Sequence, residues 1–289
     1  MQESELPADA PPNRTAYGAA VHRALHQDLD GGLIFSDPLA WQVLGVDVAE
    51  RERLVEQARE QDRPTLRTFI AMRHRFGDEA VAQAVLRGVD QVLVLGAGLD
   101  TFGLRNAAPG RAVFELDLPQ MSAWKQSMLS AAEIPIPDSL HFVAGDLARD
   151  DWLQLLAESG LSKRATTVLW FGVSPYLAAP AVKSTLAKLS TIPGVEVVFD
   201  YATTDAGLSG EAKELRDRLG NRVAALGEPF RSSWGPDEMA ALLRDLGFDE
   251  IEDLGPRELA SRYLRRPGLR AAGGGGGHLV RARRTRWGE

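Results

Sequence analysis

A glycine turn at residues 96–98 is the first feature of this sequence that suggests chemistry. Gly96, Ala97 and Gly98 directly follow the apolar run at residues 92–95. A buried strand that breaks into a glycine-rich loop typically brings its backbone close to a nucleotide-like cofactor. The turn therefore predicts a cofactor site at the end of a strand.

The residues after the turn favour a cofactor without phosphates. The third glycine of a dinucleotide fingerprint is missing, because Thr101 stands in its place. Asp100 also puts a negative charge where the two phosphates of NAD would bind at a helix N-terminus. S-adenosylmethionine (SAM) carries an adenosine, a sulfonium and an ammonium but no phosphate, so the sequence favours SAM over NAD.

Three acidic residues lie where an adenosine would need them. Glu115 and Asp117 end the second apolar run, about 20 residues past the first glycine, where a carboxylate accepts hydrogen bonds from ribose hydroxyls. Asp146 ends the third run, where it can accept from the adenine amino group while Leu147 offers a backbone amide. A single acid at a strand end is usually a helix cap, but three of them after successive strands indicate a binding edge.

Strands that alternate with helices are expected to position these residues. Apolar residues at three-to-four spacing predict helices at 14–29, 37–45, 48–61 and 64–88. Seven short strand-like runs follow and predict an α/β fold: a Rossmann-like, doubly wound, mostly parallel seven-stranded sheet with an N-terminal helical cap. The glycine run before the last strand predicts a flexible hairpin connection. The expected order is a disordered tail (1–13), the helical cap (14–88) and the SAM-binding domain (89–289), with substrate lid elements around 172–180 and 205–236.

The composition is that of an ordinary globular protein and excludes several classes of function. Apolar residues make up 44% and charged residues 25% of the 289, and the net charge of −7 argues against nucleic acid as a partner. No apolar run approaches the roughly 20 residues that would cross a membrane. The acidic, proline-rich start is unlike a signal peptide and cysteine is absent, so we expect a cytoplasmic protein without disulfides or a thiolate metal site.

Several motifs together resemble one known family. They are NRTAYGAAVHRA, FSDPLA, AMRHRFGDEAV, QVLVLGAGLDT, FELDLPQMSAWKQ, VAGDLARDDW, GVSPYL and VFDY. In this combination the chain resembles the leucine carboxyl methyltransferase group of class I SAM-dependent methyltransferases, which includes bacterial O-methyltransferases of polyketide pathways. The resemblance implies a Rossmann-like sheet, an N-terminal helical cap, SAM as the cofactor and methyl transfer to oxygen, commonly that of a carboxylate.

The resemblance also implies cofactor contacts. It pairs Arg73 with the methionine carboxylate of SAM, a bond that suits a guanidinium, and it has a basic residue near Arg14 in the first helix. The complete expected cofactor-binding set is Arg73, Gly96, Ala97, Gly98, Asp117, Leu118, Asp146, Leu147 and Phe171.

Phe171 departs from the family pattern. The family has a glutamate here, which the resemblance implies helps to hold the amino end of SAM, whereas Phe171 offers only its backbone carbonyl or the face of its ring. Two alternatives to methyl transfer therefore stay open. One is a protein of the SAM fold that binds SAM without transfer or catalyses another reaction, and the other, with less support, is an NAD(P)-dependent oxidoreductase.

The sequence singles out no catalytic acid or base, because in-line methyl transfer mainly requires positioning. A carboxylate acceptor arrives ionised, and no histidine directly follows the fourth strand, where the resemblance places the acceptor. Tyr176 and Arg231 are candidates for positioning the acceptor, with Trp234 close by. His22 and His26 have a spacing that can bind metal, but without a third ligand we expect surface or core residues and no metal.

The function predicted from the sequence is a SAM-dependent O-methyltransferase. We expect its partner to be a small-molecule acceptor with a carboxylate or hydroxyl group, in specialised, polyketide-like metabolism. The sequence leaves the acceptor and the oligomeric state open.

Overall fold

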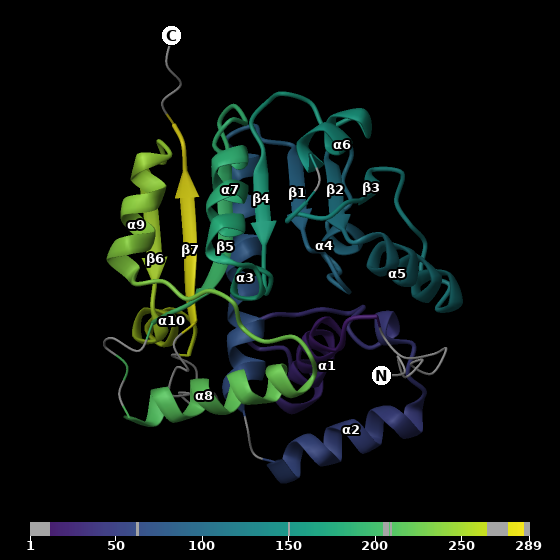
Figure 1. Cartoon of the computed structure of the whole chain (residues 1–289). Helices are drawn as coiled ribbons and strands as arrows, with labels where there is room; N and C mark the ends of the chain where they lie inside the picture. The colour runs from purple at the N-terminus through teal and green to yellow at the C-terminus, as the bar shows by residue number, and fades with distance from the viewer. Residues whose placement is uncertain are drawn as a thin grey trace, which may run out of the picture.

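The centre of the protein is a seven-stranded sheet, seen in a computed structural model that describes residues 12–61, 64–149, 151–204, 208, 210–264 and 277–285 (Figure 1). The strand order is β3-β2-β1-β4-β5-β7-β6, and only β7 runs antiparallel to its neighbours. The strands are β1 (Gln91–Leu95), β2 (Ala112–Asp117), β3 (Leu140–Ala144), β4 (Thr167–Trp170), β5 (Glu196–Ala202), β6 (Glu250–Leu254) and β7 (Gly277–Arg283). This topology confirms the predicted fold class and all seven predicted strands.

Helices precede and connect the strands. They are α1 (Arg14–Leu29), η1 (Gln42–Leu44), α2 (Val48–Gln61), α3 (Pro64–Leu86), α4 (Phe102–Arg105), α5 (Pro119–Ala131), α6 (Trp152–Glu158), η2 (Ser174–Tyr176), α7 (Ala179–Leu189), α8 (Gly210–Ala225), α9 (Pro236–Asp245) and α10 (Pro256–Tyr263). Asn13 begins α1 because its side chain accepts the Ala16 amide hydrogen bond at 2.7 Å.

The sheet is buried on both faces, which is why its central strands are continuous apolar runs. All residues of β1 and β4 are buried. One face packs against α6, α7 and α9 through residues such as Trp152, Leu186 and Met239, and the other packs against α3 and α4 through Phe76 and Phe102.

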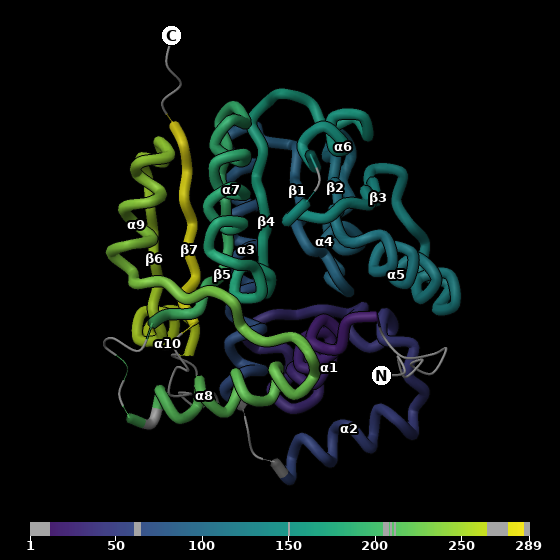
Figure 2. The backbone as a smooth tube through the Cα atoms, viewed as in Figure 1, coloured from purple at the N-terminus to yellow at the C-terminus, as the bar shows by residue number. Residues whose placement is uncertain are grey.

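The carboxyl ends of the parallel strands point toward α1 and α8, which lie across that edge of the sheet (Figures 1 and 2). A partly buried ion pair holds part of this cover together, because Arg67 of α3 binds Asp30 at the end of α1 with an Nε to Oδ2 distance of 2.7 Å. Burial would raise the pKa of the Asp30 carboxyl, but hydrogen bonds from His26 and Arg67 outweigh it and lower this pKa to about 2. The cover therefore lies where ligands bind in open α/β sheets.

The structure differs from the sequence predictions in two segments. Residues 37–45, expected to be a helix, form turns and the short η1, which Gly45 ends in the left-handed conformation (φ +62°). Helices α8 and α10 were not predicted, and α10 lies between β6 and β7, so these strands are not joined by a simple hairpin. Residues 1–11 of the predicted tail, positions 205–207 and 209 of the predicted lid, and the glycines at 273–276 lie outside the described residues.

The basic C-terminal segment is partly a structural strand. In β7, Arg281 pairs with the buried Glu196 of β5, and Arg283 pairs with Glu250 of β6. Within the described ranges, no helix has both the length and the hydropathy that a bilayer crossing requires.

Candidate cofactor and acceptor site

A cavity of about 1150 Å³ lies between the carboxyl edge of the sheet and the helices that cross it. A volume of this size holds an adenosine cofactor and a small acceptor together. The glycine turn and the strand ends line one part of it, and α1, α3 and α8 line the rest. All nine expected cofactor-binding residues line the cavity, as do Tyr176, Arg231 and Arg14.

The glycine turn is held in place by Asp117. Gly96 and Gly98 adopt φ values of +63° and +47°, and a Cβ atom on Gly96 would overlap Val173. The Asp117 carboxylate accepts the amide hydrogens of Gly98 at 2.6 Å and of Leu118 at 2.7 Å. Burial raises the pKa of this carboxyl. A carboxylate has about four acceptor positions, so Asp117 can still accept from ribose hydroxyls.

Asp146 shapes the local backbone and also lines the cavity. Its Oδ1 accepts the Ala148 amide hydrogen at 2.8 Å, and Arg149 lies 3.6 Å from its Oδ2. The side chain remains about 30% exposed at the cavity, beside Leu147. Asp146 therefore stabilises the turn at residues 147–149 and does not cap a helix, since Asp151 is the N-cap of α6. This role is compatible with the adenine role expected from the sequence.

Arg73 lies at the opposite end of the cofactor part of the cavity. Its Nη1 atom is 3.3 Å from Oδ2 of Asp200, and a Cβ atom on Gly172 would come within 2.9 Å of that Nη1. Its Nε atom is buried and has no hydrogen-bond partner among the described residues. The guanidinium as a whole lines the cavity and keeps donors that Asp200 does not use, so it can hold a ligand carboxylate such as that of the methionine part of SAM.

Phe171 lines the cavity, but its ring packs mainly against α3. A Cβ atom on Gly77 would approach Cε2 of Phe171 to 2.7 Å, so the ring occupies the space that this glycine leaves. The His74 ring lies edge-on at a centroid distance of 5.9 Å. Phe171 is thus a core residue at the wall of the site.

The expectation that Glu115 opens at the same edge as Asp117 is wrong. Its side chain is 1% exposed and pairs with Lys125, whose Nζ lies 2.5 Å from Oε2 of Glu115. Burial raises the pKa of the Glu115 carboxyl. Lys125 also donates to the backbone carbonyl of Asp100 at 2.6 Å, so the pair supports the glycine turn from beneath.

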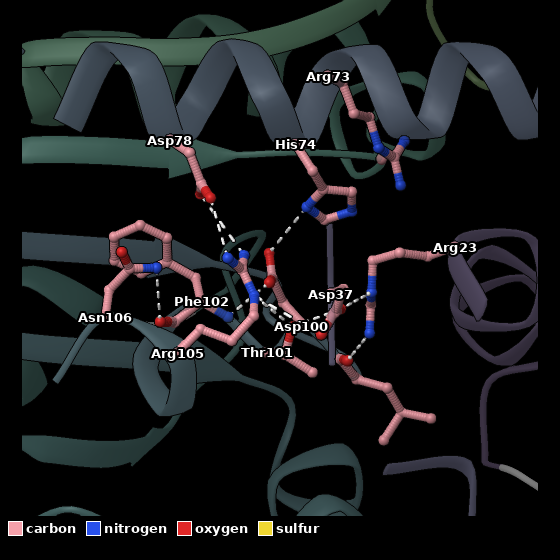
Figure 3. Close-up of polar contacts among 12 residues, drawn as sticks. Arg23, Asp37, Arg73, His74, Asp78, Asp100, Thr101, Phe102, Arg105 and Asn106 are labelled. Carbon is pink, nitrogen blue, oxygen red and sulfur yellow. Dashed lines mark hydrogen bonds and ion pairs between the residues drawn. The ribbon is translucent and has the colours of Figure 1, made fainter. Parts of the chain in front are cut away.

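Asp100 does not present a free charge to the cofactor, which corrects the argument made from the sequence. Its Oδ1 accepts the Phe102 amide hydrogen at 2.8 Å, and its Oδ2 lies 3.6 Å from Nδ1 of His74 (Figure 3). Burial would raise the pKa of Asp100, but the positive charges of Arg23, Arg105 and Lys125 outweigh it and hold this pKa far below its ordinary value. Burial lowers the pKa of His74, so this ring is neutral at neutral pH and contributes no charge there. The protein itself therefore compensates the negative charge.

A buried polar network ties the front of the chain to the glycine turn (Figure 3). Arg23 of α1 binds Asp37 at 2.7 Å and donates to the Leu99 carbonyl at 2.6 Å. Thr101 donates to the same Asp37 carboxylate at 2.7 Å, and Arg105 lies 3.7 Å from it. The covering helices and the floor of the cofactor site are thus one hydrogen-bonded unit.

The acceptor part of the cavity is mostly apolar. The Tyr176 ring packs at 5.3 Å from that of Phe230, and burial raises the pKa of its phenol. The Arg231 amide donates to the Pro175 carbonyl at 2.7 Å, and its exposed side chain lies at the cavity. Trp234, expected to help clamp the acceptor, instead is 2% exposed and packs in the core.

Several residues of this wall were missed from the sequence. His22 of α1 lines the cavity, and burial, with the charges of Arg67 and Arg222, lowers its pKa to about 4. Helix α8 adds apolar side chains together with Arg218 and Arg222. His26 is a core residue, as expected, because its ring binds Asp30 and accepts the amides of the 34–35 segment.

Comparisons with known proteins relate the whole chain to SAM-dependent methyltransferases. The chain is 26% identical over 275 residues to the Bacillus subtilis protein named "Putative S-adenosyl-L-methionine-dependent methyltransferase YktD", covering 86% of this chain and 90% of the relative. A Mycobacteroides abscessus protein with the same functional description is 33% identical over 208 residues, covering 69% and 66% of the two chains. A crystal structure of a "putative methyltransferase" from Thermobifida fusca YX shares the fold, with a TM-score of 0.58, 16% identity, and coverage of 92% of this chain and 94% of that one.

The family match is the most specific of these findings. Residues 16–190, which include the glycine turn, Arg73 and the end of β4, match the family described as "Leucine carboxyl methyltransferase". The chain therefore belongs to the leucine carboxyl methyltransferase family of SAM-dependent methyltransferases.

Proposed function

We propose that this methyltransferase acts on an oxygen atom, a carboxylate or hydroxyl, of a small apolar molecule in specialised metabolism. The observation that carries the proposal is the single cavity, which joins the cofactor residues to an apolar chamber under α1 and α8. SAM, when bound, would supply a methyl group on its sulfonium. A nucleophilic oxygen would accept this methyl group in line as the carbon–sulfur bond breaks, and the demethylated cofactor would leave.

The side chains of the chamber favour an acceptor that arrives ionised. His22, with a pKa near 4, and Tyr176, whose phenol pKa is raised by burial, are poor bases at neutral pH. A carboxylic acid, with an ordinary pKa near 4, needs no base, whereas a phenol near 10 does. The protein's part is then to exclude water and hold the acceptor oxygen in place.

The charges at the chamber also support an anionic acceptor. Arg218, Arg222 and Arg231 line it, although the protein as a whole carries a net charge of −7. A cationic opening on an acidic protein raises the local concentration of anions. We therefore place a carboxylate ahead of a hydroxyl as the methylated group.

Cofactor binding and acceptor choice can be tested separately. S-adenosylhomocysteine (SAH), the demethylated product of SAM, should raise the melting temperature of the protein, and Asp117→Ala should abolish the rise. Asp138→Ala is the matched control, because this carboxylate is exposed, does not line the cavity and should keep the SAH response. Transfer of labelled methyl from SAM to a panel of apolar carboxylic acids and matched phenols then tests the acceptor.

Protection by NAD but not by SAH would overturn the proposal. Tight SAM binding without transfer to any member of the panel would instead support a protein that binds SAM for another purpose.

A further inference from the structure

The feature that carries the inference is a carboxylate on β5 that no comparison assigns. Asp200 is 5% exposed, yet it lines the cavity. Its Oδ1 accepts the Gly172 amide hydrogen at 2.6 Å, and its Oδ2 lies 3.3 Å from Nη1 of Arg73. A buried arginine and a buried carboxylate therefore stand side by side at one end of the cofactor region.

Asp200 is the cross-strand neighbour of Phe171. Trp170 of β4 pairs with Phe199 of β5 in a parallel register, so the next residues on the two strands are adjacent and share one face of the sheet. That face is covered by α3, where Arg73 contacts Asp200 and Gly77 makes room for the Phe171 ring. Residues 73 and 77 are one helical turn apart and so lie on the same side of α3.

These contacts make Phe171 a packing residue and leave Asp200 as the acidic side chain at this part of the sheet edge. Phe171 fills a space that exists because residue 77 is a glycine, so it is an integral part of the packing. A negative charge is still present at this edge, one strand away on Asp200, about 4.8 Å being the usual spacing between strands.

We propose that Asp200 binds the ammonium group of SAM while Arg73 binds its carboxylate; the inference rests on SAM being the cofactor. The two ends of an amino acid carry opposite charges, and the Arg73–Asp200 pair offers one complementary group to each. The Arg73 guanidinium lines the cavity, and only its Nη1 atom contacts Asp200, so the arginine keeps a donor for the carboxylate. Asp200 has acceptor positions beyond those that Gly172 and Arg73 use.

The test compares two ligands that differ only in the amino group: SAH, and its desamino analogue with hydrogen in that place. Calorimetry on the parent should show that SAH binds about 10- to 100-fold more tightly, the usual effect of a charge-assisted hydrogen bond. Asp200→Asn keeps an acceptor for the Gly172 amide but loses the charge, so it should bind both ligands with similar affinity. If Asp200→Asn fails to fold, Asp200→Ser makes the same comparison with a smaller side chain.

Asp146→Asn is the matched control, because Asp146 lies at the adenine end and its loss should weaken both ligands by the same factor. An Asp200→Asn protein that keeps the full preference for SAH overturns the inference, as does a parent protein that binds both ligands equally. A parent that binds neither ligand contradicts the proposed cofactor itself, so the two failures are distinguishable.

Discussion

Gly172 offers a direct test of the link between backbone conformation and cofactor binding. It adopts φ +68°, and an added Cβ would lie 2.9 Å from Nη1 and 3.1 Å from Nη2 of Arg73. In Gly172→Ala, the left-handed backbone costs about 1–2 kcal/mol, part of which a less flexible unfolded chain offsets, so we expect a net loss of about 1 kcal/mol in unfolding free energy. The displaced guanidinium should also weaken SAH binding about 10- to 100-fold, since charged hydrogen bonds are worth about 1.5–3 kcal/mol.

Gly31→Ala separates the two effects. Gly31 has a similar φ of +60°, but no atom lies within 4 Å of its added Cβ, so this variant experiences only the backbone cost. Denaturant unfolding should give similar losses of stability for the two variants, while calorimetry should show weaker SAH binding for Gly172→Ala alone. Equal SAH affinities in the two variants would refute the idea that the empty Cβ position of Gly172 seats Arg73.

Three further changes have defined outcomes. Lys125→Met leaves the buried Glu115 carboxylate without its ion-pair partner and should lower the free energy of unfolding by about 3–5 kcal/mol, measured with denaturant. This loss should grow as the pH rises through the raised pKa of Glu115, because the unpaired carboxylate then becomes charged. Adding Glu115→Gln should make the loss smaller. Asp30→Asn should lower the free energy of unfolding at pH 7 by about 1 kcal/mol, because solvent screens this partly exposed carboxylate. The difference from the parent should narrow as the pH falls from about 4 toward 2, because the carboxylate stabilises the fold only while ionised. Glu228→Ala removes an acceptor for the Arg14 amide and the Thr15 hydroxyl at the start of α1, so we expect about 1 kcal/mol lower stability in thermal melts and faster SAH release in stopped flow.

The fold was largely predictable because its signals are local. The strands are buried on both faces and read as short apolar runs, and the predicted bounds of α1 and α2 agree with the structure. Helix α8 was harder to predict because most of its residues are polar although one side of it lines the cavity. Residues 37–45 have the apolar spacing of a helix, but the tertiary contacts of the buried Asp37 override this local preference.

The site was predictable where function depends on the backbone and on strand ends, as at Gly96 and Asp117. The position of the Glu115 side chain, which is buried and does not line the cavity, depends on its ion pair with Lys125. The spacing of acids along a strand does not reveal that Lys125 is buried beneath the turn. Asp200 was overlooked, although an acid inside the apolar run of β5 is itself a signal, since a buried charge needs a partner.

The network beneath the glycine turn limits how this protein can be recombined with its relatives. Arg23 contacts the Leu99 carbonyl, and Asp37 contacts Thr101 and Arg105. The side chains of Arg23, Asp37 and Arg105 are at most 10% exposed. A chimaera that exchanges only the front helices and brings a neutral residue to position 37 leaves two arginines buried without their shared carboxylate. We therefore expect that the front helices, which line the proposed acceptor chamber, can be exchanged between relatives only together with the glycine turn.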